Sequence, residues 1–216
     1  MTFEYKSFDF HIDKSLGGTS LALIGSTKCG KSTLMKYLKH HCFKRDITIM
    51  FSMNSHADIY KSLDKNVLIC NEYHPELIKE AHQLNAISKN RYPFLFICDD
   101  YVDHRIKNDP EITRLLSLYR NANMSSIQCF QRTTMMSAAG RNNTNFVFIF
   151  KQNTASNWED VVKEFLSMYM PSSMTLREMV DYCKSATEDH RFFVVDTVNS
   201  ICYLSKLSVE QVREIS

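Results

Sequence analysis

Short apolar runs alternate along the chain with stretches in which apolar residues recur at helical spacing. The runs predict strands at 21–25, 47–52, 67–70, 94–99, 126–130 and 146–150. The helical spacing predicts helices at 31–42, 75–88, 110–121, 157–169 and 175–185. Strands and helices in alternation are typical of a mostly parallel central sheet covered by helices on both faces. The pattern therefore predicts an α/β protein.

Two of the apolar runs, at 94–98 and 146–150, contain no polar residue. A strand that is covered by helices on both faces is apolar throughout, so these two strands are predicted to lie inside the sheet. Near the carboxyl end of the sequence, the segments 191–196 and 201–204 flank a short polar turn. This arrangement predicts a hairpin at the edge of the sheet.

The composition is that of one globular domain, which we expect to span 1–216. Hydrophobic residues make up 44% of the chain, enough for a sizeable core, and no Pro/Gly-rich linker interrupts it. The first residues lack an apolar signal core and no apolar run is long enough to span a membrane. The seven cysteines have no C-x-x-C spacing, which indicates reduced thiols in a cytosolic compartment. The net charge of +2 neither requires nor excludes nucleic acid.

Residues 25–33 match the phosphate-binding pattern G-x-x-x-x-G-K-[ST], and they stand between a predicted strand and a predicted helix, as the pattern requires. Gly25 and Gly30 allow the tight turn that aims backbone N–H groups at phosphate oxygens. Lys31 is expected to reach the β- and γ-phosphates, and the Ser32 hydroxyl to hold Mg²⁺. The loop therefore predicts binding of ATP with Mg²⁺. The predicted nucleotide-binding residues are Gly25, Ser26, Thr27, Lys28, Cys29, Gly30, Lys31, Ser32 and Thr33.

Two carboxylates, Asp99 and Asp100, follow the apolar run at 94–98. Such a strand carries Asp99 to the edge of the sheet where ligands bind, and there Asp99 is expected to hold Mg²⁺ through a water molecule. Asp100 is then placed to polarise an attacking water, which favours hydrolysis over transfer to a second substrate. A guanine-reading N-K-x-D segment and a compact arginine cluster are both missing after Asp100. A motor ATPase is favoured, with a nucleoside or nucleotide kinase and an ATP-binding assembly module without turnover as alternatives.

Three further elements follow in order. Arg120 stands where a helix is predicted to end, Gln131 follows a predicted strand, and Arg141 opens Arg-Asn-Asn before the last fully apolar run. With the phosphate loop and the paired aspartates, these elements resemble the HerA–FtsK group of P-loop translocases. Within that group they are similar to the poxvirus-type genome-packaging ATPases of large DNA viruses. The resemblance covers roughly residues 18–151. Many related motors carry Asp-Glu where this chain carries Asp99-Asp100.

The resemblance implies a RecA-like fold and ATP hydrolysis at sites between the subunits of a homo-oligomeric ring. Gln131 would orient the attacking water or report hydrolysis, and Arg120 matches the arginine finger that enters the neighbouring subunit's site. The alternative for Arg120 is a helix-ending arginine that contacts its own last carbonyls. Arg141 is a second finger candidate or a residue that pins the loop before the strand, and Arg132 is a candidate through its closeness to Gln131. The implied catalytic set is Lys31, Asp99, Asp100, Gln131, Arg120 and Arg141.

The resemblance also implies the partners, which are double-stranded DNA and a capsid or portal-vertex protein. The implied location is the host cell cytoplasm or a virus factory, with association to the virion as a further location. The loops at 104–108 and 132–136 carry basic residues and are candidates to touch the DNA backbone. The alternative is a pair of solvated loops with incidental charge.

Overall fold

The protein is described by a computed structural model that covers residues 3–13, 17–44, 46–53, 60, 63, 66–99 and 107–215. Within these residues lies an eight-stranded sheet with the order β3-β2-β4-β5-β1-β6-β7-β8. The strands are β1 (Ser20–Ile24), β2 (Ile47–Ser52), β3 (Val67–Cys70), β4 (Phe94–Asp99), β5 (Met124–Phe130), β6 (Phe146–Ile149), β7 (Phe192–Asp196) and β8 (Ile201–Ser205). The first six pair in parallel, whereas β6–β7 and β7–β8 are antiparallel pairs.

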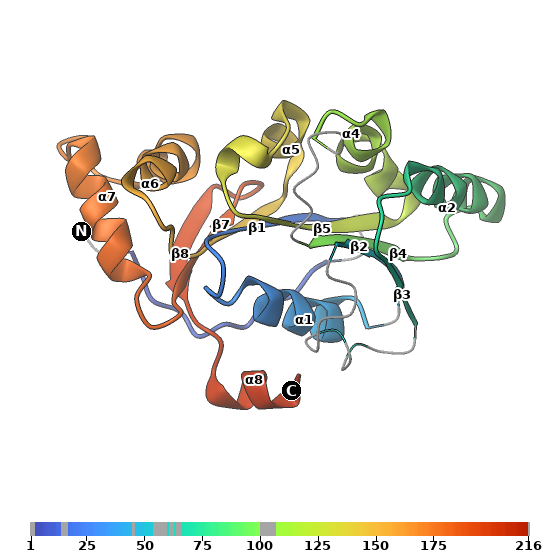
Figure 1. Cartoon of the computed structure of the whole chain (residues 1–216), viewed down its shortest axis with the longest axis horizontal. Helices are drawn as coiled ribbons and strands as arrows, with labels where there is room; N and C mark the ends of the chain where they lie inside the picture. The colour runs from blue at the N-terminus through green and yellow to red at the C-terminus, as the bar shows by residue number, and fades with distance from the viewer. Residues whose placement is uncertain are drawn as a thin grey trace.

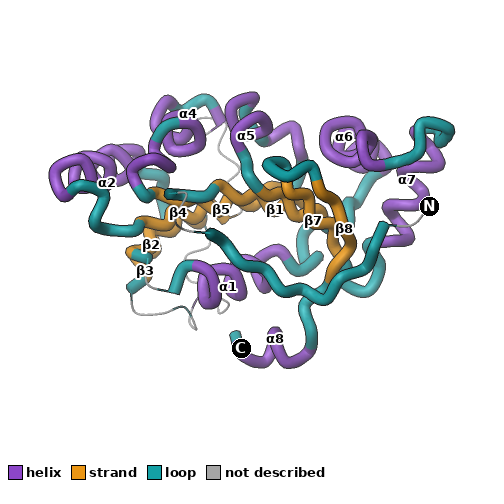
Figure 2. The backbone as a smooth tube through the Cα atoms, turned by 180° about the vertical axis from the view of Figure 1, so that it is seen from behind, coloured by secondary structure: helices purple, strands orange, loops and turns teal. Residues whose placement is uncertain are grey.

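Helices cover both faces of the sheet, but unequally (Figures 1 and 2). Helices α1 and α8 lie on one face, and α2, α4, α5, α6 and α7 lie on the other. The helices are α1 (Lys31–Cys42), α2 (Pro75–Ser88), α4 (Pro110–Ser117), α5 (Ala138–Asn143), α6 (Ala155–Val161), α7 (Leu176–Ala186) and α8 (Val209–Glu214). Within the described part of the chain, every helix is too short or too polar to traverse a lipid bilayer. The predicted α/β class, mostly parallel sheet and two covered faces are confirmed.

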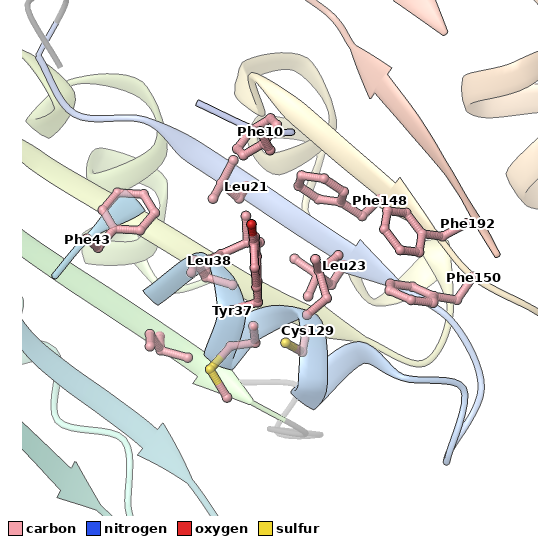
Figure 3. Packing of buried hydrophobic residues seen from close by; sticks show 14 of the residues in the cluster. Phe10, Leu21, Leu23, Tyr37, Leu38, Phe43, Cys129, Phe148, Phe150 and Phe192 are labelled. Atoms are coloured by element: carbon pink, nitrogen blue, oxygen red, sulfur yellow. The ribbon is translucent and has the colours of Figure 1, made fainter. Parts of the chain in front are cut away.

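The strands at the centre of the sheet are buried on both faces, and alternate residues belong to different cores. In β1, Leu21 and Leu23 pack with α1, whereas Ala22 and Ile24 face the cluster beneath α6 and α7. Figure 3 shows the α1 side, where Phe148 of β6 lies beside the β1 leucines. The predicted interior positions of β4 and β6 are confirmed by the strand order. Their apolar sequence follows from this double burial.

The predicted hairpin is present as β7 and β8, and β8 lies at the edge of the sheet. The amino-terminal segment covers part of this edge, because Lys6 N donates to Leu204 O and Leu204 N donates to Glu4 O, each at 2.9 Å. Farther along, Phe8 and Phe10 enter the core on the α1 side. Covering an edge strand removes unpaired backbone groups that invite association with other strands.

Two predicted helices were too long. The helix predicted at 110–121 begins as expected, with the Asp109 side chain accepting from Glu111 N and Ile112 N, but α4 ends at Ser117. A 3₁₀ turn at Tyr119–Ala122 follows, and Asn123 at φ +56° closes it. The tighter turn and the left-handed residue bring the chain round into β5 within a few residues.

The helix predicted at 157–169 begins at Ala155 and breaks into three pieces. The helix α6 gives way to a π-helical segment at Val162–Leu166 and a 3₁₀ turn at Ser167–Tyr169. Helices α5 and α8 were not predicted at all. Each has only six residues, which is too short for an apolar period to repeat.

Candidate active site

The phosphate loop is held between the carboxyl ends of the two strands that flank β1. Gly25 N donates to Phe130 O at the end of β5 at 3.0 Å, and Ser26 N donates to Lys151 O just beyond β6 at 2.9 Å. Helix α1 begins at Lys31, so the loop joins a buried strand to a helix N-terminus. This position gives an incoming anion both backbone donors and the partial positive charge of the helix end.

The two motif glycines are required by the geometry of the loop. A β-carbon on Gly25 would lie 2.6 Å from Phe150 Cβ and 2.8 Å from Cys29 Sγ. Gly30 adopts φ +109°, a conformation that favours glycine. Cys29 is buried, with its sulfur against Gly25. Its thiol therefore packs the base of the loop.

Lys31 is the most enclosed charged group of the loop. Its Nζ donates to the carbonyls of Gly25 and Ser26, both at 2.9 Å, and only 5% of the residue is exposed. The ammonium group thus lies inside the curve of the loop, where phosphate oxygens are better acceptors than the two neutral carbonyls. Thr27 and Lys28 are exposed at the crest.

Asp99 ends β4 and is completely buried beside Ser52, its register partner on β2. The hydroxyl of Tyr60 donates to Asp99 Oδ2 at 2.7 Å and lies 3.2 Å from Ser52 Oγ. Burial, and then the negative charge of Asp99, raise the pKa of Tyr60, so the phenol stays protonated as a donor. Tyr60 was missed by the sequence reasoning, because it lies in a stretch without helical or strand periodicity.

Gln131 follows β5, which lies between β1 and β4. The preceding carbonyl, that of Phe130, accepts from Gly25 N, so Gln131 stands next to the first residue of the phosphate loop. Its expected place beside the strand that carries Asp99 is confirmed. Asp100 lies outside the described residues, so its assignment as the water-polarising group stays a prediction.

Arg120 lies at the opposite, amino edge of the sheet. It belongs to the 3₁₀ turn before β5 rather than to the end of a helix, which corrects the sequence prediction. Its carbonyl accepts from Gly18 N at 2.7 Å, just before β1 begins. The seven residues of β5 separate it from Gln131, a distance of roughly 23 Å at the usual rise of a strand. Arg120 and the phosphate loop of the same chain therefore lie apart.

Arg141 lies in α5, whereas the sequence reasoning placed it in a loop. The Ser137 side chain caps this short helix by accepting from Gly140 N at 2.9 Å. The Arg141 guanidinium donates to Met136 O at 2.8 Å and pairs with Glu164 at 3.3 Å. It therefore binds its own chain, in line with the alternative of a residue that pins the segment before β6.

The two loops considered for DNA contact meet each other. Lys107 Nζ donates to Thr134 O at 2.6 Å, which joins the segment before α4 to the segment after β5. Within the second loop Arg132 is exposed, whereas Met136 is fully buried. The residues 104–106 lie outside the described part of the chain.

A phosphate loop between β1 and α1, at the carboxyl edge of a mostly parallel sheet, defines an α/β P-loop fold. Solved structures with this fold include the genome-packaging NTPase B204 of Sulfolobus turreted icosahedral virus 2 in complex with AMPPCP. It is 16% identical, has a TM-score of 0.62, and the match covers 88% of this chain and 98% of B204. At this identity the likeness shows the fold alone.

Two further solved structures share the fold. The pCW3 conjugation coupling protein TcpA with ATPγS is 13% identical, with a TM-score of 0.61 over 94% of this chain and 65% of TcpA. The EssC ATPases 2 and 3 from Geobacillus thermodenitrificans are 13% identical, with a TM-score of 0.58 over 92% of this chain and 42% of theirs. These likenesses also concern the fold alone.

The similar curated sequences are viral. Uncharacterized protein 015R of Frog virus 3 (isolate Goorha) is 26% identical over 183 residues, which are 81% of this chain and 56% of the relative. Uncharacterized protein 075L of Invertebrate iridescent virus 6 is 27% identical over 156 residues, which are 68% of this chain and 60% of the relative. The chain thus spans less than two thirds of either relative. No family model matches the sequence.

Proposed function

We propose that this chain is an ATP-driven motor of the HerA–FtsK group, in its poxvirus-type branch, that moves double-stranded DNA into a viral capsid. The observation that carries the proposal is the enclosed Lys31 of the phosphate loop together with the buried Asp99 at the same edge of the sheet, in a fold shared with B204. B204 of Sulfolobus turreted icosahedral virus is described as a DNA-packaging ATPase. The viral relatives support a viral role, and a capsid or portal-vertex protein is the proposed docking partner.

The loop residues bind the triphosphate in this proposal. Lys31 exchanges the carbonyls of Gly25 and Ser26 for phosphate oxygens, and the backbone N–H groups of the loop donate to the same phosphates. Because phosphate carries full negative charge, the exchange strengthens the hydrogen bonds that Lys31 makes. The loop itself stays anchored to β5 and β6.

Ser32 and Asp99 suit Mg²⁺, because both offer hard oxygen donors beside the phosphate loop. The ion would neutralise charge on the phosphates. Gln131 orients the attacking water, and Asp100 accepts a proton from it. Tyr60 holds the Asp99 carboxylate in place by donating to Oδ2.

Arg120 acts on a neighbouring subunit in this proposal. Among the described residues no side-chain hydrogen bond or ion pair involves its guanidinium, and it lines a cleft of about 1080 Å³ at the amino edge. The length of β5 keeps it from its own phosphate loop. A finger role therefore requires a second copy of the chain, which is the arrangement in a ring.

Hydrolysis is the first test. Purified protein should release phosphate from ATP, faster with double-stranded DNA and more steeply than linearly with protein concentration. Lys31→Ala should reduce the rate by roughly 10²–10³-fold, the usual loss when one donor to developing charge is removed. The control is Lys184→Ala, which changes an exposed lysine of α7. Phosphate that appears on an added nucleoside, without free phosphate, would instead identify a kinase.

Mixed oligomers test the shared site. Arg120→Ala and Lys31→Ala subunits should each hydrolyse ATP only at their strongly reduced rates, whereas a mixture should regain part of the activity at interfaces that hold both residues intact. Mixtures as inactive as the separate variants would exclude Arg120 as a finger. Arg132→Ala in the same mixtures tests a further candidate, which is exposed at the carboxyl edge.

A further inference from the structure

The side chain of Gln152 is buried just beyond β6, although it is polar. Only 4% of the residue is exposed. Its Nε2 donates to Phe150 O at 2.7 Å and to Ile24 O at 3.4 Å. Ile24 ends β1, and the next residue, Gly25, is the first of the phosphate loop. The amide therefore joins the carboxyl ends of β1 and β6 at the point where the loop begins.

The other end of the same amide has no partner. Gln152 Oε1 is buried and accepts no hydrogen bond from any described residue. Turning the amide over would not help, because Oε1 would then face the carbonyl oxygens of Phe150 and Ile24, which are also acceptors. A buried acceptor without a donor destabilises the folded chain, whereas an apolar side chain of similar length would leave no such atom. The stability of the free protein therefore does not account for a glutamine here.

The start of the phosphate loop is held by two sets of hydrogen bonds, one from Lys31 and one from the segment after β6. Lys31 Nζ donates to Gly25 O and Ser26 O, both at 2.9 Å. The segment after β6 supplies Lys151 O, which accepts from Ser26 N at 2.9 Å, and the Gln152 amide. When Lys31 turns to the phosphates, as proposed above, the carbonyls of Gly25 and Ser26 lose this donor. Among the described residues, Gln152 is then the side chain that still ties the entry of the loop to the sheet.

We propose that Gln152 is a positioning residue for nucleotide binding, which holds the entry of the phosphate loop in place once Lys31 has moved to the phosphates. The inference rests on the proposed nucleotide binding and adds a residue outside the G-x-x-x-x-G-K-[ST] pattern. In the occupied loop, Nε2 keeps its two carbonyls, and Oε1 accepts from a donor that the rearranged loop supplies. The amide is thus used at both ends only when phosphate is bound, so it favours the bound form.

Titration with inorganic tripolyphosphate and Mg²⁺ tests this role, because that ligand fills the phosphate loop without a nucleoside. In Gln152→Met an apolar side chain of similar length takes the place of the amide. Its affinity for tripolyphosphate, measured by calorimetry, should fall about tenfold, since hydrogen bonds that favour the bound form are lost. The melting temperature of the free protein should change little, because the unsatisfied acceptor is removed together with the donor.

The matched control is Gln83→Met, at an exposed glutamine of α2. It should bind tripolyphosphate as the unaltered protein does. The proposal is overturned if Gln152→Met keeps its affinity for tripolyphosphate, whether or not its melting temperature falls. A fall in melting temperature with full affinity would assign Gln152 to folding alone. If the unaltered protein binds neither ATP nor tripolyphosphate, the proposed function itself fails.

Gln152→Glu provides a second test, which does not depend on how well the methionine variant folds. A protonated carboxyl group has one donor and one acceptor, as the amide does, whereas a carboxylate has acceptors only. Because burial raises the pKa of a carboxyl group, at about pH 5.5 this variant should bind tripolyphosphate almost as the unaltered protein does. At about pH 8 it should bind at least about tenfold more weakly than the unaltered protein. A ratio of affinities that stays constant between these two pH values would contradict the role of the amide donor.

Discussion

The two edges of the sheet differ in how their charged groups are used. At the carboxyl edge, Lys31 and Asp99 are buried and hydrogen-bonded within the chain. At the amino edge, Arg120 lines a wide cleft and its side chain makes no hydrogen bond or ion pair with the described residues. Within its described residues, a single chain thus holds groups suited to binding phosphate at one edge and, at the other, an arginine side chain without such bonds. The proposed finger role of Arg120 requires a second copy of the chain to bring these groups together.

Arg141 is a useful contrast to Arg120, because its guanidinium is bonded within its own chain. It reaches a backbone carbonyl and a carboxylate of the same chain. The sequence made Arg120 the first candidate for the finger and left Arg141 as a second candidate or a residue that pins its own loop. In the structure, the Arg141 guanidinium binds Met136 O and Glu164, whereas that of Arg120 has no such bond with the described residues.

The largest expected effect belongs to the amino edge. Arg120→Ala should reduce ATP turnover by about 10³-fold or more, the range that an arginine finger contributes. ATP affinity and the melting temperature should stay unchanged, because the guanidinium makes no hydrogen bond or ion pair with the described residues and Arg120 lies at the edge of the sheet opposite the phosphate loop. Phosphate release, ATP titration and thermal unfolding check these three results. The control is Arg177→Ala on α7. A loss of stability in place of turnover would show that Arg120 has a structural role.

Arg141→Ala should lower the stability of the protein and leave its ATP turnover in place, the reverse of Arg120→Ala. The loss of its bonds to Met136 and Glu164 should lower the free energy of unfolding by about 1–3 kcal/mol, the range for hydrogen bonds to charged groups. Turnover by the folded protein should persist. Denaturant unfolding measures the change, and Lys163→Ala, which breaks an exposed pair with Glu159, should change it little. Lost turnover with intact stability would return Arg141 to the finger candidates.

Tyr60→Phe tests the carboxyl edge. Removal of the hydroxyl takes a donor from the buried Asp99, so the melting temperature of the free protein should fall, by an amount that corresponds to about 1 kcal/mol. Added ATP with Mg²⁺ should then raise the melting temperature more than in the unaltered protein, because it supplies positive charge near Asp99. Tyr92→Phe, at an exposed ring, is the control. If ATP with Mg²⁺ raises the melting temperature of the variant by the same amount as that of the unaltered protein, Tyr60 has no role at the metal site.

The smallest effect lies away from both edges, where His41 meets α8. Burial, followed by the nearby charge of His40, lowers the pKa of His41 despite its pair with Glu214. The native state then binds fewer protons than the unfolded state, so stability should fall as the pH drops through about 6.5. Urea unfolding between pH 5 and 7.5 measures the slope. His41→Gln should flatten it, whereas His11→Gln at an exposed position should not. An equal slope in both would assign the effect to other groups.

Much of the fold could be read from local patterns. The central strands are apolar because both of their faces are covered. The phosphate loop is one continuous stretch, and its turn requires glycine at Gly25 and Gly30. The position of Asp99 could be predicted for the same reason, since it ends an apolar strand. The contact of Tyr60 with the site and the helix α8 could not be predicted, because their positions depend on contacts with Asp99 and with α1 rather than on their own sequence.

By itself, the sequence determined the alternation of strands and helices, the phosphate loop and the carboxylate at the end of β4. These features depend on residues that are close together along the chain, so the sequence alone is enough to predict them. Only the tertiary structure decided that Arg120 and Lys31 stand at opposite edges of the sheet, that Arg141 binds its own chain, and that α8 lines a cavity beside the loop. The pairs Arg120 and Lys31, Arg141 and Glu164, and Gln211 of α8 and Tyr37 of α1 are each far apart along the chain, so packing of the whole protein sets their relation.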